Sequence, residues 1–155
     1  MSRVGTDRNG VRPDEPSVTV INAHPSCRLR HQPFIAAVSG VLAFAGVEQG
    51  EIRIIFVDEA ELLQLNRDFL GHDYHTDVIT FPIESDPLEG EVYISVEMTR
   101  TQAGEEGVSF YEEARRLAIH GALHLVGYDD GTTEEREAMR RLEDRFLEIG
   151  ETPSC

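Results

Sequence analysis

Residues 117–127, with the sequence LAIHGALHLVG, place the strongest limit on how this chain can fold. Apolar or small residues surround the whole helical cylinder here, and His120 and His124 are its only polar side chains. A helix that is apolar on all sides is stable only when it is buried. The segment therefore predicts a buried helix that carries two imidazoles into the interior of the fold.

His120 and His124 are four positions apart, so they lie on one face of the helix and their rings can converge on a single point. Buried imidazoles need polar partners. Gly127 can adopt the left-handed conformation that ends a helix, and the turn after it lets Asp130 point back at both rings. Two neutral imidazoles and one carboxylate are a ligand set that zinc accepts with a fourth position open, as in catalytic sites. The competing interpretation is a hydrogen-bonded pair of core histidines.

The spacing H-x-x-x-H-x-x-G-x-x-D is the frame of the extended metzincin zinc motif, with Asp130 in place of the third His. Metalloproteases of that kind carry Glu as general base directly after the first His. Here that position is Gly121, which has no side chain to accept a proton. The sequence thus predicts a metzincin-like zinc helix, but it disfavours peptide hydrolysis and leaves a metallopeptidase as the third choice of function.

The rest of the chain predicts one α+β domain, for which 155 residues are an ordinary length. Periodicity and capping signals give the order strand, helix, strand, helix, strand, strand and three helices. The predicted strands cover 17–22, 51–57, 78–82 and 91–96, and the helices cover 32–45, 58–71, 97–107, 109–126 and 132–149. We expect a small four-stranded mixed sheet packed by about five helices, with a disordered tail at 1–16, a single domain over 17–150 and a C-terminal tail at 151–155.

The composition is strongly acidic, because 14 Arg and no Lys stand against 29 Asp and Glu, for a formal net charge of −15. This charge argues against tight non-specific binding to nucleic acid. Many of the acids lie in residues 105–113 and 134–148, where solvated helix faces are the simplest interpretation. A cleft lined by Arg67, Arg100 or Arg115 could remain locally positive; alternatively, Arg115 and Arg116 pair with Glu112 and Glu113 on their own helix.

The sequence contains no apolar run long enough to span a membrane, and its first residues do not form a secretory signal. Its two cysteines, Cys27 and Cys155, form neither a disulfide framework nor a thiolate metal site. We therefore expect a cytoplasmic protein with no membrane partner.

Three blocks of the sequence resemble the YbeY family, bacterial zinc proteins of rRNA maturation. HGALHLVGYDD at 120–130 is similar to the family's HGxLHLxGYDH, LNRDFLGHDYHTDVITFP at 65–82 to LNxxYRGKDKPTDVLSFP, and EGEVYISVEMTRTQA at 89–103 to the GDIVIS strand and the helix after it. The resemblance covers residues 51–150 and, more weakly, the part from residue 17 onward. It implies an α+β fold in which helices pack on a small, mostly parallel sheet.

The resemblance also implies a site. One Zn²⁺ per chain would be bound by His120, His124 and Asp130, and the cleft wall would include Thr76, Asp77 and Thr80, with both threonines in contact with substrate. The family's third ligand is usually His, so Asp130 gives this site a lower net charge.

A second departure from the family pattern concerns substrate binding. Leu70 stands where the family usually has Arg, and His72 and Tyr74 stand where it has two Lys. These changes remove cations expected to meet phosphates. Arg67, one helical turn earlier, lies roughly on the same face and could substitute for them; the alternative is that Arg67 is only a solvated helix charge.

The function implied by the resemblance is that of a single-strand endoribonuclease in 16S rRNA 3′-end maturation and ribosome quality control. Its partners would be rRNA and ribosomal subunits, with ribosomal proteins as further candidates and no DNA. No residue of the zinc motif is an obvious proton acceptor; Asp77 and Asp129 are candidates, although each could instead have a structural or turn-capping role. The alternative function is a ribosome-assembly or RNA-binding factor with a mainly structural zinc site, which the acidic charge and the missing general base favour.

Overall fold

A computed structural model describes residues 15–148 of the chain. Within that range the elements are β1 (Ser17–Asn22), α1 (Gln32–Phe44), β2 (Gly50–Val57), α2 (Glu59–Leu70), β3 (Val78–Ser85), β4 (Leu88–Ser95), α3 (Val96–Glu106), α4 (Phe110–Leu125) and α5 (Thr133–Leu147). This is the predicted order. Apart from Glu15 and Pro16, the two predicted tails lie outside the described residues, as does the end of the last predicted helix.

The strands form one four-stranded sheet in the order β1-β2-β4-β3. β1, β2 and β4 run parallel, with Val20 opposite Ile54 and Ile54 opposite Val92. β3 is an edge strand that runs antiparallel to β4, with Thr80 opposite Val92. The prediction of a mixed, mostly parallel sheet packed by five helices is confirmed for the described residues.

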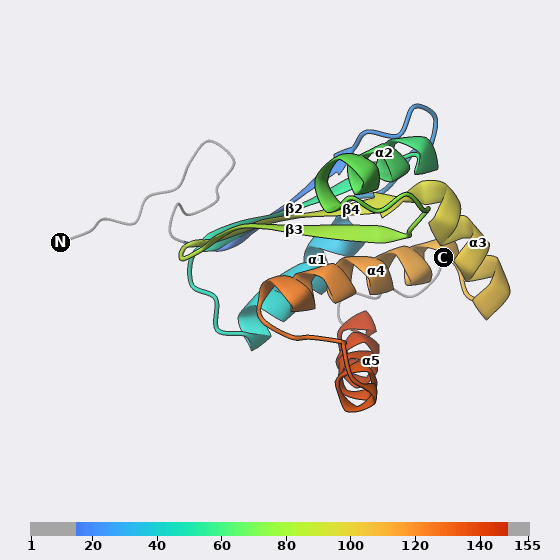
Figure 1. Ribbon diagram of the computed structural model, residues 1–155. Helices are drawn as coiled ribbons and strands as arrows, with labels where there is room; N and C mark the ends of the chain where they lie inside the picture. The colour runs from blue at the N-terminus through green and yellow to red at the C-terminus, as the bar shows by residue number, and fades with distance from the viewer. Residues whose placement is uncertain (1–14, 149–155) are drawn as a thin grey trace.

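Helices cover both faces of the sheet (Figure 1). α1 and α4 pack on one face over the main core, which includes Ile54 and Val92, whereas α2 packs on the other face over a smaller cluster with Ile55 and Ile79. Successive residues of β2 therefore serve opposite layers, and its near-continuous apolar run is what a parallel strand buried on both faces requires.

α4 is the central helix, because it contacts α1, α3, α5, β3 and β4. These contacts explain why its sequence is apolar all round. They also explain Gly121: a Cβ atom at this position would lie 2.6 Å from Cγ1 of Val92 and 3.1 Å from Oγ1 of Thr80. The helix approaches the sheet too closely there for any side chain, including the Glu that zinc peptidases carry after their first His.

The β3–β4 hairpin is longer than predicted. The sequence predicted strands over 78–82 and 91–96, but β3 continues through Pro82 to Ser85 and β4 already begins at Leu88. Proline lacks an N–H group for the ladder and is tolerated on an edge strand or at a bulge. Both conditions hold here, since β3 is at the sheet edge and its register shifts between Pro82 and Glu84.

The helix starts follow their predicted caps. The side chains of Asp58, Ser109 and Thr132 each accept a hydrogen bond from a backbone N–H three residues later, and Thr132 with Glu135 forms a complete capping box. No helix between residues 15 and 148 has the length and apolar character needed to cross a membrane.

Candidate metal centre

The end of α4 brings the two histidines and Asp130 together. Gly127 has a φ of +109°, which an L side chain would strain. Its N–H donates to the carbonyl oxygen of His124 at 3.1 Å, and the N–H of Tyr128 donates to the carbonyl oxygen of Leu123 at 3.0 Å. These bonds end the helix and reverse the chain, as the glycine predicted. Asp130 is thereby directed back at the helix that precedes it.

Three ligand atoms converge at this point. Nε2 of His120 and Nε2 of His124 are 3.1 Å apart, and Oδ2 of Asp130 lies 3.3 Å from each of them. Bonds of about 2.0–2.2 Å to a tetrahedral zinc ion would separate neighbouring ligand atoms by about 3.3–3.6 Å. The side chains therefore fit around one small divalent cation, and one face of the triangle is left for a further ligand.

The other nitrogen of His120 is held by Glu143 of α5. Nδ1 of His120 lies 2.7 Å from Oε2 of Glu143, whose residue is only 5% exposed. A carboxylate can only accept, so Nδ1 carries the proton and Nε2 keeps its lone pair directed at His124 and Asp130. Burial lowers the pKa of His120, but the hydrogen bond and charge of Glu143 outweigh it, and the pKa is raised. A carboxylate that orients the distal nitrogen is the usual support of a metal-bound histidine.

Glu143 is the residue that sequence reasoning missed. The acids of residues 134–148 were expected on a solvated face, but the carboxylate of Glu143 is buried between His120 and Arg116, whose Nη1 donates to its Oε1 at 3.1 Å. A signal was present in the sequence: Glu143 follows Met139 by four positions and precedes Phe146 by three, so it lies on the buried stripe of its helix.

The pairing expected for two arginines of α4 is also corrected. Arg116 pairs with Glu143 and with Asp144, at 2.7 Å, rather than with a residue of its own helix, and Arg115 donates to the carbonyl oxygen of Leu147 at 2.7 Å. Arg115 is buried, so it does not provide the positive cleft wall considered from the sequence. Both arginines attach α5 to α4, which fixes Glu143 relative to His120.

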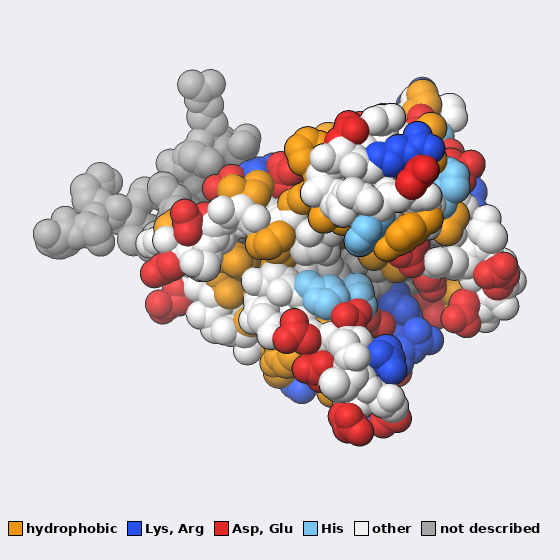
Figure 2. All heavy atoms as spheres, in the orientation of Figure 1, with side chains coloured by type: hydrophobic (Ala, Val, Ile, Leu, Met, Phe, Trp, Pro, Cys, Tyr) orange, Lys and Arg blue, Asp and Glu red, His pale blue; other side chains and the backbone are white. Residues whose placement is uncertain are grey.

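Two hollows open beside the histidines, and Figure 2 shows the pale-blue histidine side chains on the floor of this recessed region. The first, here called the α5 hollow, has a volume of about 300 Å³ and is lined by Asp77, Val78, Glu113, Arg116, Leu117, His120, Asp130, Arg136, Met139, Arg140 and Glu143. The second, the loop hollow, has a volume of about 290 Å³ and is lined by Asn66, Leu70, His72, Tyr74, Thr76, Val78, Ile79, Thr80, His120 and His124. His120 lines both, so the three ligand atoms lie where the two hollows meet.

Of the other predicted site residues, some line the two hollows and some do not. Thr76 and Thr80 line the loop hollow beside the histidines, and Asp77 lines the α5 hollow. Oδ2 of Asp77 accepts a hydrogen bond from Gln102 at 3.0 Å, which holds the carboxylate in place. Asp129 is exposed and lines neither hollow.

The three residues that replace the family's Arg and two Lys all line the loop hollow. Leu70, His72 and Tyr74 belong to it, and the two rings of the last pair are stacked with centroids 5.1 Å apart. Arg67 lines neither hollow, and its guanidinium is paired with Asp73. No arginine therefore lines the loop hollow.

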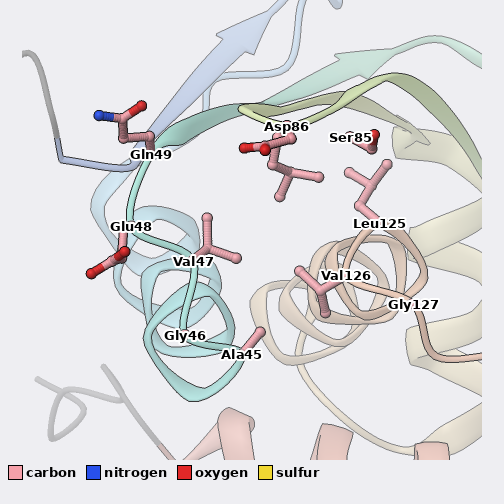
Figure 3. A pocket seen from close by; sticks show the side chains of 11 residues that line it. Ala45, Gly46, Val47, Glu48, Gln49, Ser85, Asp86, Leu125, Val126 and Gly127 are labelled. Atoms are coloured by element: carbon pink, nitrogen blue, oxygen red, sulfur yellow. The ribbon is translucent and has the colours of Figure 1, made fainter.

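A larger hollow lies elsewhere. It has a volume of about 570 Å³ and is formed by the loop after α1, the β3–β4 turn and the end of α4 (Figure 3). Val47, Leu125 and Val126 form its apolar walls, whereas the carboxylate of Glu48 points away from it. It contains no converging ionisable groups, so we place the chemistry at the histidines instead.

Comparisons with known proteins identify the family of this chain. The sequence profile described as "Endoribonuclease YbeY" matches residues 23–150. The protein named endoribonuclease YbeY of Chlorobaculum tepidum is 46% identical over 108 residues, which cover 69% of this chain and 79% of the relative. The protein of the same name from Chlorobium phaeovibrioides is 40% identical over 132 residues, or 84% of this chain and 86% of the relative.

A solved structure gives the same answer for the fold. The solution structure of TM1509 from Thermotoga maritima matches with a TM-score of 0.61 and 25% identity, over 84% of this chain and 87% of that one. With a profile match across most of the chain and relatives above 40% identity, the chain belongs to the endoribonuclease YbeY family.

Proposed function

We propose that this protein is a zinc-dependent endoribonuclease that cuts single-stranded RNA, acting on rRNA in 16S 3′-end maturation and ribosome quality control. The observation that carries the proposal is the convergence of His120, His124 and Asp130 at mutual distances of 3.1–3.3 Å, in a chain of the endoribonuclease YbeY family. These three side chains would hold one Zn²⁺. Ribosomal subunits are the proposed partners.

Side chains of the protein would have separate roles around the metal ion. When bound, zinc supplies Lewis-acid chemistry toward a phosphodiester and can activate a water molecule. Glu143 keeps His120 in the tautomer whose Nε2 can bind a cation. Asp77 lines the same hollow as His120, and its carboxylate, held by Gln102, is our candidate proton acceptor. The hydroxyl groups of Thr76 and Thr80 offer hydrogen bonds to an RNA strand in the loop hollow.

A metallopeptidase is disfavoured on steric grounds. The zincin mechanism needs a carboxylate directly after the first histidine. At that position Gly121 lies against Val92, with no room for a Cβ atom. We expect the metal-loaded protein to leave casein intact, and casein cleavage that depends on His124 would contradict this argument.

The test compares the wild type with His124→Ala, using an RNA oligonucleotide that spans the 3′ end of precursor 16S rRNA. His31→Ala is the matched control, because His31 is exposed and its side chain makes no capping bond. We expect only His124→Ala to lose bound zinc, measured by elemental analysis, and endonuclease activity. Circular dichroism confirms that the variants are folded.

The result also separates the nuclease from its main rival. If folded, metal-free His124→Ala still supports 16S rRNA maturation in cells, the enzymatic proposal is wrong and the protein is an assembly factor. Product ends distinguish the two routes of cleavage: a 2′,3′-cyclic phosphate indicates attack by the RNA 2′-hydroxyl, and a 5′-phosphate indicates attack by water.

A further inference from the structure

The arginines of the α5 hollow differ sharply in their partners. Arg116 is neutralised by Glu143 and Asp144. Arg136 and Arg140 line the same hollow, yet neither forms an ion pair with a carboxylate anywhere in residues 15–148. Elsewhere in the described residues Arg53 contacts three glutamates, although Arg28, Arg100 and Arg141 also form no ion pair with a carboxylate.

Arg136 lies next to the candidate metal ligands. Its Nη1 is 3.4 Å from the carbonyl oxygens of Asp130 and Gly131, and its Nη2 is 3.3 Å from Oγ1 of Thr133. These are long bonds to neutral acceptors, so the guanidinium keeps its charge uncompensated. The contacts place that charge beside the backbone of Asp130.

Arg140 is one helical turn beyond Arg136 on the same face of α5, at a side-chain spacing of about 5–6 Å. It is exposed and makes no hydrogen bond or ion pair with any residue between 15 and 148. Figure 2 shows arginine side chains in blue beside the pale-blue histidines on this side of the recess. The guanidinium groups of Arg136 and Arg140, neither in an ion pair within residues 15–148, thus line the hollow in the direction that leads away from the candidate metal ligands.

A bound divalent cation would cancel the excess negative charge of the hollow. Its carboxylates are those of Asp77, Glu113, Asp130 and Glu143, against three arginines. A bound divalent ion raises the positive charges to five, which balances these four carboxylates together with Asp144, the second partner of Arg116. Glu143 is already saturated by His120 and Arg116, and Asp77 accepts from Gln102. Within residues 15–148, Arg136 and Arg140 form no ion pair, and Glu113 lies close enough to Arg140 to interact with its charge.

We propose that Arg136 and Arg140 form a phosphate subsite that binds the RNA backbone next to the phosphodiester at the metal. This inference rests on the proposed function. The subsite replaces cations that the loop hollow lacks, since Leu70, His72 and Tyr74 line that side and Arg67 is paired with Asp73. The RNA strand lies with its phosphates toward α5, where the planar guanidinium groups bind phosphate oxygens by paired hydrogen bonds.

The test measures RNA affinity separately from cleavage. Zinc-loaded wild type, Arg140→Gln, Arg140→Lys and Arg136→Gln are titrated into a fluorescent single-stranded RNA at 50–200 mM KCl, with bound zinc measured in each sample. Arg141→Gln is the matched control, because Arg141 is exposed on the same helix and does not line the hollow. Arg140→Gln is the cleanest variant, since Arg140 is exposed and forms no hydrogen bond or ion pair within residues 15–148.

We expect Arg140→Gln and Arg136→Gln to weaken RNA binding about tenfold with zinc content unchanged, and Arg141→Gln to bind within about twofold of the wild type. The plot of log affinity against log salt should change its slope by about 0.7 for each lost phosphate contact. Arg140→Lys keeps the charge and should recover part of the affinity.

Each other outcome has a distinct meaning. If the wild type binds and cleaves RNA but Arg140→Gln binds as Arg141→Gln does, the subsite is wrong and the nuclease stands. If RNA binding depends on Arg140 but no variant cleaves, the subsite stands and the nuclease falls. If Arg140→Gln only relieves inhibition by inorganic phosphate, with RNA affinity unchanged, the site takes free phosphate and the RNA assignment is overturned. If the wild type neither binds nor cleaves RNA, both proposals fail.

Discussion

Replacing Glu143 tests whether the proposed metal site extends beyond its three candidate ligands. The carboxylate accepts from Nδ1 of His120 at 2.7 Å and from Arg116 at 3.1 Å, in a residue that is 5% exposed. Glu143→Gln keeps the shape of the side chain and one acceptor oxygen but removes the charge. Glu143→Ala removes both, so the two variants separate charge from hydrogen bonding.

The expected size follows from these contacts. Losing the carboxylate that orients a metal-bound histidine costs about 10- to 100-fold in metal affinity, or about 1.4–2.8 kcal/mol. We place Glu143→Gln at the lower end of this range, because its amide oxygen can still accept from Nδ1, and Glu143→Ala at the upper end. In the metal-free protein, Arg116 keeps Asp144 as a partner at 2.7 Å, so Glu143→Ala should lower the free energy of unfolding by about 2–3 kcal/mol rather than the larger cost of stranding a buried charge.

Metal affinity is measured by competition with a chromogenic zinc chelator, and stability by urea unfolding in excess EDTA. Glu137→Gln is the matched control, since Glu137 is exposed on the same helix and should leave both quantities unchanged. If Glu143→Ala, shown to be folded, binds zinc as tightly as the wild type, Glu143 does not support the site and the tautomer assigned to His120 has no functional role.

Three further predictions concern stability in urea unfolding. Gly121→Ala should lower the free energy of unfolding by about 1–2 kcal/mol, because overpacking against Val92 at 2.6 Å outweighs the roughly 1 kcal/mol that Ala gains over Gly in a helix. An unchanged or more stable variant would show that α4 can move off the sheet. Thr132→Ala should cost about 1 kcal/mol through loss of the capping box, and a change below about 0.3 kcal/mol would make that cap irrelevant. Burial raises the pKa of Glu113, so the folded state binds this proton more tightly than the unfolded state, and the stability of the wild type falls as the pH rises from the ordinary carboxyl range through the raised pKa. The stability of Glu113→Gln relative to the wild type should therefore increase from pH 4 to pH 8. A difference that does not change with pH would refute the raised pKa.

The sequence predicted the fold best where a signal is local. Caps at Asp58, Ser109 and Thr132 set helix starts to within a residue, and Gly71 and Gly107 end helices with a positive φ. The convergence of His120, His124 and Asp130 needs only one helix and the turn after it, so eleven consecutive residues contain it. The strand order β1-β2-β4-β3 and the length of the hairpin depend on pairing between distant residues, which periodicity does not encode.

The surroundings of the site were harder to predict because they come from another helix. Glu143, Arg136 and Arg140 all belong to α5, whose position over α4 is fixed by packing of Met139 and Phe146. A charged residue is predicted to be exposed to solvent unless its position relative to the apolar residues on the buried face of its helix is taken into account. Glu113 illustrates the same rule on α4: it precedes Leu117 by four positions and is buried with it.

The net charge of −15 does not settle whether RNA can bind, because it describes the molecule at distances that salt screens. At 0.1 M ionic strength the Debye length is about 10 Å, so repulsion from acids on the far faces of the protein is weak at the site. Contacts within hydrogen-bonding distance are screened much less, and there Arg136, Arg140 and a bound cation decide the sign of the local field. The acidic exterior should therefore slow the approach of RNA without preventing its retention by the cations of the recess.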